Sequence, residues 1–234
     1  MGEWLEIPTE DGVFGAYLAR PQAESAPAIV VIQEIFGVNE VMRAVADGFA
    51  EAGYLALCPD LFWRIAPRVE LTDRSEAEWK RAFELFNAFD IDAGVRDLDI
   101  TITAARSLRG ASGEVGTVGF CLGGLLAFLC ATRTTVDAAV GYYGVGIDRH
   151  LGAAESLNAP LMLHIAEEDQ FAPRPAQEKI IAALGSRPNV TLYRYPGRDH
   201  AFARPGGSHY DAADAGLASE RTLAMFSAVL RRGV

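Results

Sequence analysis

Hydrophobic residues in this chain form short unbroken runs that alternate with longer stretches of helical periodicity. A strand that is buried on both faces reads as such a run. Six runs predict buried strands, at residues 28–33, 54–58, 114–120, 138–142, 160–165 and 190–195. Apolar positions three or four apart predict six helices, at residues 39–52, 75–89, 92–108, 122–132, 176–184 and 219–231.

Alternation of strands and helices predicts the α/β class, with a mostly parallel central sheet covered by helices on both faces. Internal repeats, low-complexity segments and Pro/Gly-rich linkers are not visible in the sequence. We therefore expect a single domain over residues 1–234. Residues 64–76 are the least regular and are expected to run over the surface.

Composition and net charge argue against two classes of binding partner, nucleic acids and anionic membranes. Hydrophobic residues make up 50% of the chain and the net charge is −10. A strongly acidic chain is repelled by nucleic acid and by anionic membrane surfaces, so we expect neither as a partner. No apolar run approaches the roughly 20 residues that a membrane-spanning helix needs. The net charge says little about a small acidic substrate, because a local basic pocket can lie inside an acidic protein.

The three cysteines, Cys58, Cys121 and Cys130, cannot all pair with one another and lack the spacing of a zinc site. We expect reduced thiols in a cytoplasmic protein. The N-terminal residues lack the basic start and apolar core of a signal peptide, which agrees with that location.

The segment Gly119-Phe120-Cys121-Leu122-Gly123-Gly124 follows a predicted strand and begins a predicted helix. It matches the G-x-S-x-G nucleophile turn of α/β-hydrolases, with cysteine in the serine position. The sharp turn needs glycines where side chains would clash, and the helix N-terminus favours a thiolate. The alternative is a packed cysteine in a tight turn, which we assign to Cys58 and Cys130 but not to Cys121.

The α/β-hydrolase order places an acid and then a histidine after the nucleophile. His200 follows the strand at residues 190–195 in a loop, where the fold needs its base. His209 is the fallback. His164 lies within a predicted strand and is expected to be a packed residue, and His150 precedes the acid.

Three acidic residues follow the strand that contains His164, namely Glu167, Glu168 and Asp169. Asp169 lies furthest along the loop and is the expected partner of His200. Glu167 and Glu168 fit a solvated acidic turn better. Asp199 is adjacent to His200 and is poorly placed to reach its ring.

Two backbone amides are expected to stabilise an oxyanion. Leu122 directly follows the nucleophile, and Ile35 lies in the loop after the first buried strand, where this fold places its second donor. Glu34 precedes Ile35. It is either a capping or surface acid, or a group that touches the thiol and controls its ionisation.

Several motifs together give the chain a resemblance to the dienelactone hydrolase family: the Cys121 turn, Gln33-Glu34-Ile35-Phe36-Gly37, Gly141-Tyr142-Tyr143-Gly144, Cys58-Pro59-Asp60-Leu61 and His200-Ala201-Phe202-Ala203-Arg204. The likeness spans nearly the whole chain. It implies an α/β-hydrolase domain that is often monomeric and needs no metal or cofactor. It also implies a triad of Cys121, Asp169 and His200, with Glu34 binding the thiol before substrate arrives.

Members of that family hydrolyse dienelactone, in the breakdown of chlorinated aromatics, and hold its carboxylate with arginines. Arg204 matches one such arginine, although a surface ion pair is the alternative. The other arginine falls at Trp79, with Lys80 and Arg81 next to it. On a helix these neighbours point about 100° and 200° away from Trp79.

Phe83 and Phe86 stand where the family has polar aromatic residues, so the resemblance implies a more apolar pocket. The predicted substrate-binding set is Arg204, Arg81, Phe36, Trp79, Phe83 and Tyr143. The expected function is hydrolysis of a lactone or carboxylic ester through a thioester on Cys121. A general carboxylesterase or thioesterase with an apolar acyl pocket is the alternative, followed by a non-catalytic binding module. We expect a cytoplasmic monomer or weak homodimer.

Overall fold

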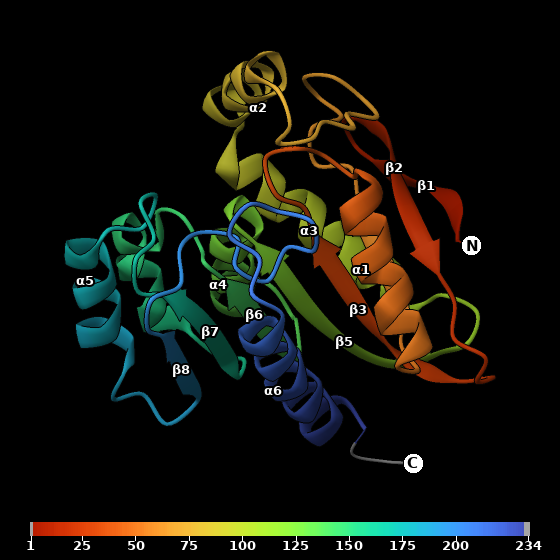
Figure 1. Cartoon of the computed structure of the whole chain (residues 1–234). Coiled ribbons are helices and arrows are strands. Elements are labelled where there is room, and N and C mark those ends of the chain that lie inside the picture. The colour runs from red at the N-terminus through yellow and green to blue at the C-terminus, as the bar shows by residue number, and fades with distance from the viewer. Residues whose placement is uncertain (1, 232–234) are drawn as a thin grey trace. The chain divides into compact units, whose positions relative to one another are not determined.

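The computed structural model describes residues 2–231 (Figure 1), which separate into two compact units, residues 2–116 and 117–231. The prediction of a single domain stays a prediction. The strands are β1 Glu3–Thr9, β2 Gly12–Ala19, β3 Ala26–Ile32, β4 Leu55–Pro59, β5 Ala111–Phe120, β6 Ala138–Tyr142, β7 Leu161–Ala166 and β8 Val190–Tyr195. The helices are α1 Glu40–Glu51, α2 Glu76–Ala88, α3 Ile91–Arg106, α4 Leu122–Arg133, α5 Arg174–Leu184 and α6 Ala212–Leu230, with 3₁₀ turns η1 Ile147–Arg149 and η2 Leu151–Ser156.

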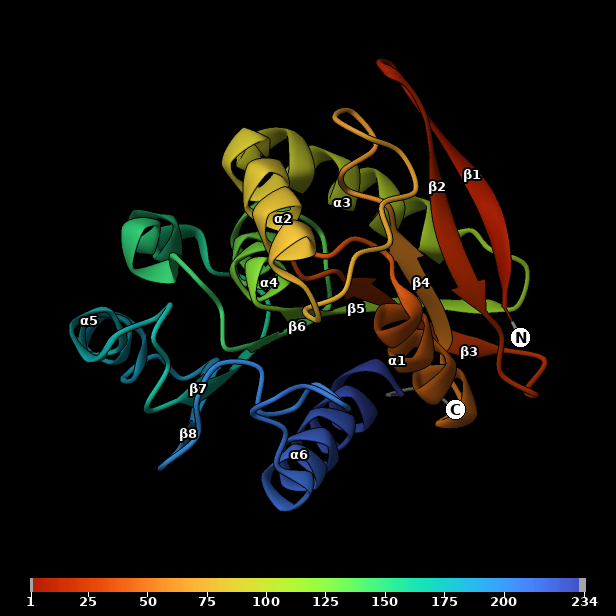
Figure 2. The same ribbon diagram turned by 45° about the horizontal axis from the view of Figure 1, so that its top comes forward.

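In the first unit the strand order is β1-β2-β4-β3. The β1-β2 pair is a long antiparallel hairpin (Figure 2), β2 pairs antiparallel with β4, and β3 pairs parallel with β4. Every residue of β3 and β4 is buried, and α1 and α3 pack against both strands. Such burial explains the unbroken apolar runs at these positions.

The second unit continues the β-α-β pattern. Its strand order is β5-β6-β7-β8, and the β6-β7 and β7-β8 pairs are parallel. Helix α4 is buried along almost its whole length and packs against β6 and β7, while α6 packs against β6. The parallel strands place their carboxyl ends, and the loops that follow them, at one edge of the sheet.

Side-chain caps fix where most helices begin. Asn39, Ser75, Asp90 and Asp211 each accept a hydrogen bond from a backbone N–H in the first turn of α1, α2, α3 and α6, respectively. Among residues 2–231 no helix is long and apolar enough to cross a membrane.

Candidate functional site

Cys121 lies between β5 and α4 with a backbone that non-glycine residues rarely adopt, φ 57° and ψ −115°. Its amide donates to the Tyr142 carbonyl at 3.1 Å, and its own carbonyl accepts from the amides of Gly124 at 3.0 Å and Val145 at 3.2 Å. These bonds hold the turn from both sides. The strained conformation is therefore fixed by the surrounding backbone.

The glycines around Cys121 leave no room for a side chain. A Cβ on Gly119 would lie 1.8 Å from the Gly123 carbonyl oxygen. A Cβ on Gly124 would lie 2.7 Å from both the Gly144 Cα and the Tyr142 carbonyl oxygen. The predicted clash at Gly119 is confirmed, and Gly124 is a further position where the backbone leaves no room for a Cβ.

The structure brings His200 and Asp169 together in the second unit, as predicted. His200 Nδ1 lies 2.8 Å from Asp169 Oδ2, and both residues are buried, at 7% and 3% exposure. The His200 side chain also hydrogen-bonds the side chain of Cys121. Cys121, His200 and Asp169 thus form a continuous chain of side chains, and Cys121 itself is 8% exposed.

The electrostatics of His200 reflect both partners. Burial acts to lower its pKa, but the negative charge of Cys121 and the hydrogen bond to Asp169 outweigh burial and raise the pKa to about 10. His200 therefore keeps its proton to a higher pH than a free imidazole does.

Asp169 is held by its own loop. Its Oδ1 accepts hydrogen bonds from the amides of Phe171 at 2.8 Å and Ala172 at 3.1 Å, which leaves Oδ2 for His200. Backbone bonds also join this loop to the one that contains His200, because the Glu168 amide donates to the Arg198 carbonyl at 2.9 Å.

Aromatic rings flank the imidazole of His200. The Tyr143 ring lies edge-on with its centroid 5.0 Å away, and the Phe171 ring lies 4.9 Å away. Tyr143 was predicted at the site. Phe171 was not, and its only sequence signal is its place two residues after Asp169.

The other histidines have different surroundings. His164 is buried, its ring nitrogens contact the hydroxyls of Tyr195 at 2.7 Å and Thr222 at 3.1 Å, and burial lowers its pKa to about 3. The prediction of a packed residue is confirmed. The fallback His209 contacts the His200 carbonyl oxygen through Nδ1 at 3.1 Å. Asp199 accepts from the His200 backbone amide at 2.6 Å.

Two further predicted residues lie in the second unit. Leu122 is the first residue of α4, so its amide N–H has no acceptor within the helix and is the kind of donor that an oxyanion needs. Arg204 lies partly buried in the turn after His200, where its amide donates to the Ala201 carbonyl at 3.0 Å.

The remaining predicted residues belong to the first unit. Glu34 and Ile35 are buried in the loop after β3, where Gln33 pins the backbone by donating to the Glu34 carbonyl and accepting from the Leu61 amide at 3.0 Å. The role predicted for Glu34, control of the Cys121 thiol, stays a prediction.

Three predicted aromatic residues of the first unit form one cluster. The Phe36 and Trp79 rings meet edge-to-face at 5.0 Å, and Trp79 stacks on Phe83 at 5.6 Å. Arg81 instead pairs with Glu84 on the exposed side of α2, Nη1 to Oε2 at 3.1 Å. Trp79 therefore lies among aromatic side chains.

Comparison with known proteins shows the family to which this chain belongs. Residues 14–230 match the model of the dienelactone hydrolase family. A protein of Azospirillum brasilense is 49% identical over 225 residues, covering 95% of this chain and 96% of its own. The carboxymethylenebutenolidase of Pseudomonas putida is 42% identical over 222 residues, covering 94% of each chain.

A solved structure from Klebsiella pneumoniae has a TM-score of 0.85 at 29% identity, covering 97% of this chain and 98% of its own. The likeness confirms the predicted α/β-hydrolase fold. With a family match over nearly the whole chain, this protein belongs to the dienelactone hydrolase family and is a hydrolase of the carboxymethylenebutenolidase type.

Proposed function

We propose that this protein hydrolyses lactones or carboxylic esters through a thioester on Cys121. The observation that carries the proposal is the continuous set of side chains from Cys121 through His200 to Asp169, on a turn whose backbone is strained. A packed structural cysteine needs neither a protonated histidine partner nor a left-handed backbone.

Acylation follows from these contacts. The Cys121 thiolate attacks the carbonyl carbon, the S–C bond forms, and the oxyanion accepts from the Leu122 amide, with the Ile35 amide as the predicted second donor. The ester C–O bond then breaks, and protonated His200 gives its proton to the leaving alkoxide. In a lactone that alkoxide stays tethered to the acyl group.

Deacylation uses the neutral His200 that acylation leaves behind. His200 removes a proton from water, the hydroxide attacks the thioester carbonyl, and the Cys121 thiolate leaves as the free acid forms. Asp169 keeps the ring of His200 oriented and stabilises its positive charge. No metal or cofactor takes part in the proposed steps.

The nucleophile is tested by two variants and a mass measurement. Cys121→Ala and Cys121→Ser should lower kcat for p-nitrophenyl acetate by at least about 1,000-fold, since they remove the thiolate. Wild-type protein quenched in acid should carry one acetyl group on Cys121, and iodoacetamide should block both labelling and turnover. Unimpaired hydrolysis by Cys121→Ala would exclude the thioester. A wild-type protein that binds esters without hydrolysing them would instead support the alternative of a non-catalytic binding module.

A carboxylate-bearing lactone is the first substrate class that we propose, with Arg204 as its cation. Arg204→Met should raise KM for dienelactone by about 10- to 100-fold, the equivalent of one charged hydrogen bond. It should leave a neutral ester nearly unaffected. Equal effects on both substrates would remove Arg204 from carboxylate binding.

A general carboxylesterase is the second candidate, favoured by the cluster of Phe36, Trp79 and Phe83. It predicts that kcat/KM rises from acetyl to butyryl esters and that dienelactone is a poor substrate.

The role proposed for Glu34 is restraint of the Cys121 thiol before substrate arrives, and it predicts an altered pH profile of ester hydrolysis in Glu34→Gln. An unchanged profile would remove Glu34 from the mechanism.

A further inference from the structure

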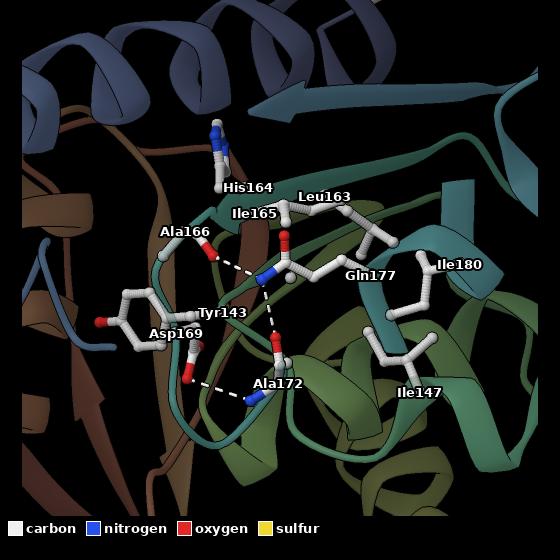
Figure 3. A pocket seen from close by; sticks show the side chains of 12 residues that line it. Tyr143, Ile147, Leu163, His164, Ile165, Ala166, Asp169, Ala172, Gln177 and Ile180 are labelled. Atoms are coloured by element: carbon white, nitrogen blue, oxygen red, sulfur yellow. Dashed lines mark hydrogen bonds between the residues drawn. The ribbon is translucent and has the colours of Figure 1, made fainter. Parts of the chain in front are cut away.

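Gln177 is a buried polar residue that the sequence gave no reason to select. It lies on α5 with a 3% exposed side chain. Its amide Nε2 lies 3.0 Å from the Ala166 carbonyl and 2.7 Å from that of Ala172 (Figure 3). It also lies 3.3 Å from the Glu167 carbonyl. One side-chain amide therefore donates to three backbone oxygens.

These oxygens lie at the two ends of the loop that contains Asp169. Ala166 ends β7, and Ala172 precedes α5. Ala172 connects the two sets of bonds directly, because its N–H donates to Asp169 Oδ1 and its carbonyl accepts from Gln177 (Figure 3). A movement of Ala172 away from Gln177 would also move the amide that holds Asp169.

Few other donors can replace the Gln177 amide at the carbonyls of this loop. A side-chain amide has two N–H groups, so the three acceptors already share them. Buried carbonyls without a donor are unfavourable, and the rest of the small cavity around Gln177 is lined largely by apolar side chains such as Ile147, Leu163 and Ile180 (Figure 3). Removing the amide would therefore shift the loop backbone.

We propose that Gln177 is a positioning residue, which closes the loop at residues 166–172 and so fixes the orientation of the Asp169 carboxylate toward His200. Its effect on turnover rests on the proposed function. Its effect on the geometry of His200 and Asp169 does not.

The central variant is Gln177→Met, which keeps the length of the side chain and removes the donor. We expect kcat/KM for p-nitrophenyl acetate to fall about 10- to 100-fold, the size of effect that small misplacements of reacting groups produce. The alkaline limb of the pH profile should move to lower pH, because His200 loses part of the Asp169 bond that helps to keep it protonated. Lys179→Met, an exposed change on the same helix, is the matched control and should leave both unchanged.

Dependence on Asp169 separates positioning from a general loss of stability. In an Asp169→Asn background, Gln177→Met should cause little further loss of kcat/KM, since both changes act on one bond. An undiminished loss in that background would overturn the proposal. So would a folded Gln177→Met with a wild-type pH profile.

A measurement without turnover tests the same geometry. The Nδ1–H proton of His200 should give a downfield NMR resonance in the wild type, and this resonance should shift or broaden in Gln177→Met. Gln177→Asn, with its shorter stem, should show a smaller change in the same direction and serves if Gln177→Met does not fold. An unchanged resonance overturns the role of Gln177. A wild type without ester hydrolysis overturns only the proposed function.

Discussion

The turn at Cys121 cannot accommodate larger side chains at its glycine positions. Gly119 and Gly124 face backbone atoms, which cannot rotate away as a side chain can. Cys121 itself keeps a Cβ in spite of its positive φ. Main-chain contacts therefore exclude any side chain at Gly119 and Gly124, whereas Cys121 carries a side chain in spite of its backbone conformation.

Gly119→Ala tests these contacts. The new Cβ would lie 1.8 Å from the Gly123 carbonyl oxygen, so the turn must shift, and we expect a loss of about 1–3 kcal/mol in the free energy of unfolding together with most of the activity. Gly216→Ala, exposed on α6 with open space around it, should instead stabilise by about 0.5–1 kcal/mol. Urea unfolding measures both, and a neutral Gly119→Ala would contradict the crowding.

Cys121→Ser tests the charge that His200 experiences. Burial lowers the pKa of His200, and the charge of Cys121 is the largest of the effects that raise it to about 10. A serine hydroxyl stays neutral, so the pKa should fall below that of the wild type. The wild-type ring should lose its proton only near pH 10, and the variant ring at lower pH. An NMR titration of the imidazole follows both, and identical midpoints would contradict a thiolate–imidazolium pair.

At the scale of elements, the start of α6 is bonded to the loop that contains His200. Asp211 caps the helix by accepting from the Asp214 amide at 3.0 Å, and it accepts from Arg198 Nη1 at 2.5 Å. Arg198 Nε also lies 2.7 Å from Asp214 Oδ2. The Arg198 carbonyl accepts from the Glu168 amide in the loop that contains Asp169, so hydrogen bonds join the start of α6 to both the His200 loop and the Asp169 loop.

Asp211→Ala should lower the free energy of unfolding by about 1–2 kcal/mol, since it removes a cap and an ion pair together. Asp211→Asn keeps an acceptor for the cap and should cost less. Urea unfolding gives both values. Equal losses in the two variants would assign the effect to the charge rather than to the cap.

Elements with strong apolar periodicity could be predicted from the sequence, and the others could not. The predicted helix at residues 39–52 became α1 within one residue at each end because Asn39 caps it. The β1-β2 hairpin was missed, since β1 is mostly not buried and the apolar residues of β2 are preceded by Gly12 and interrupted by Gly15. The start of α6 was missed over residues 212–218 because alanine, glycine and aspartate there give little amphipathic signal.

The contact between His200 and Asp169 could be predicted because chain order and strand ends restrict which residues can meet. Gln177 could not be predicted, because its partners are backbone carbonyls that leave no mark on residue identity. The ring of Phe171 beside His200 had no more than its nearness to Asp169 as a signal.

At the scale of the molecule, the two compact units differ in their fluorophores. All three tryptophans, Trp4, Trp63 and Trp79, belong to the first unit. Tryptophan emission therefore reports the unfolding of that unit, while far-UV circular dichroism reports both.

If residues 1–234 form the predicted single domain, the urea midpoints from tryptophan emission and from circular dichroism should coincide, as two-state unfolding requires. Cys121→Ala should show the same coincidence, since the change lies in the second unit. Two separated midpoints would show that the units unfold independently and would contradict the single-domain prediction.

The backbone of Cys121 has a consequence for engineering. A left-handed, non-glycine conformation of this kind is unfavourable by about 1–3 kcal/mol, and glycine would relieve it. A library selected for heat resistance alone would thus be drawn toward replacing the very residue that carries the thiol. A selection for heat resistance in this protein should therefore also screen each variant for retention of the Cys121 thiol.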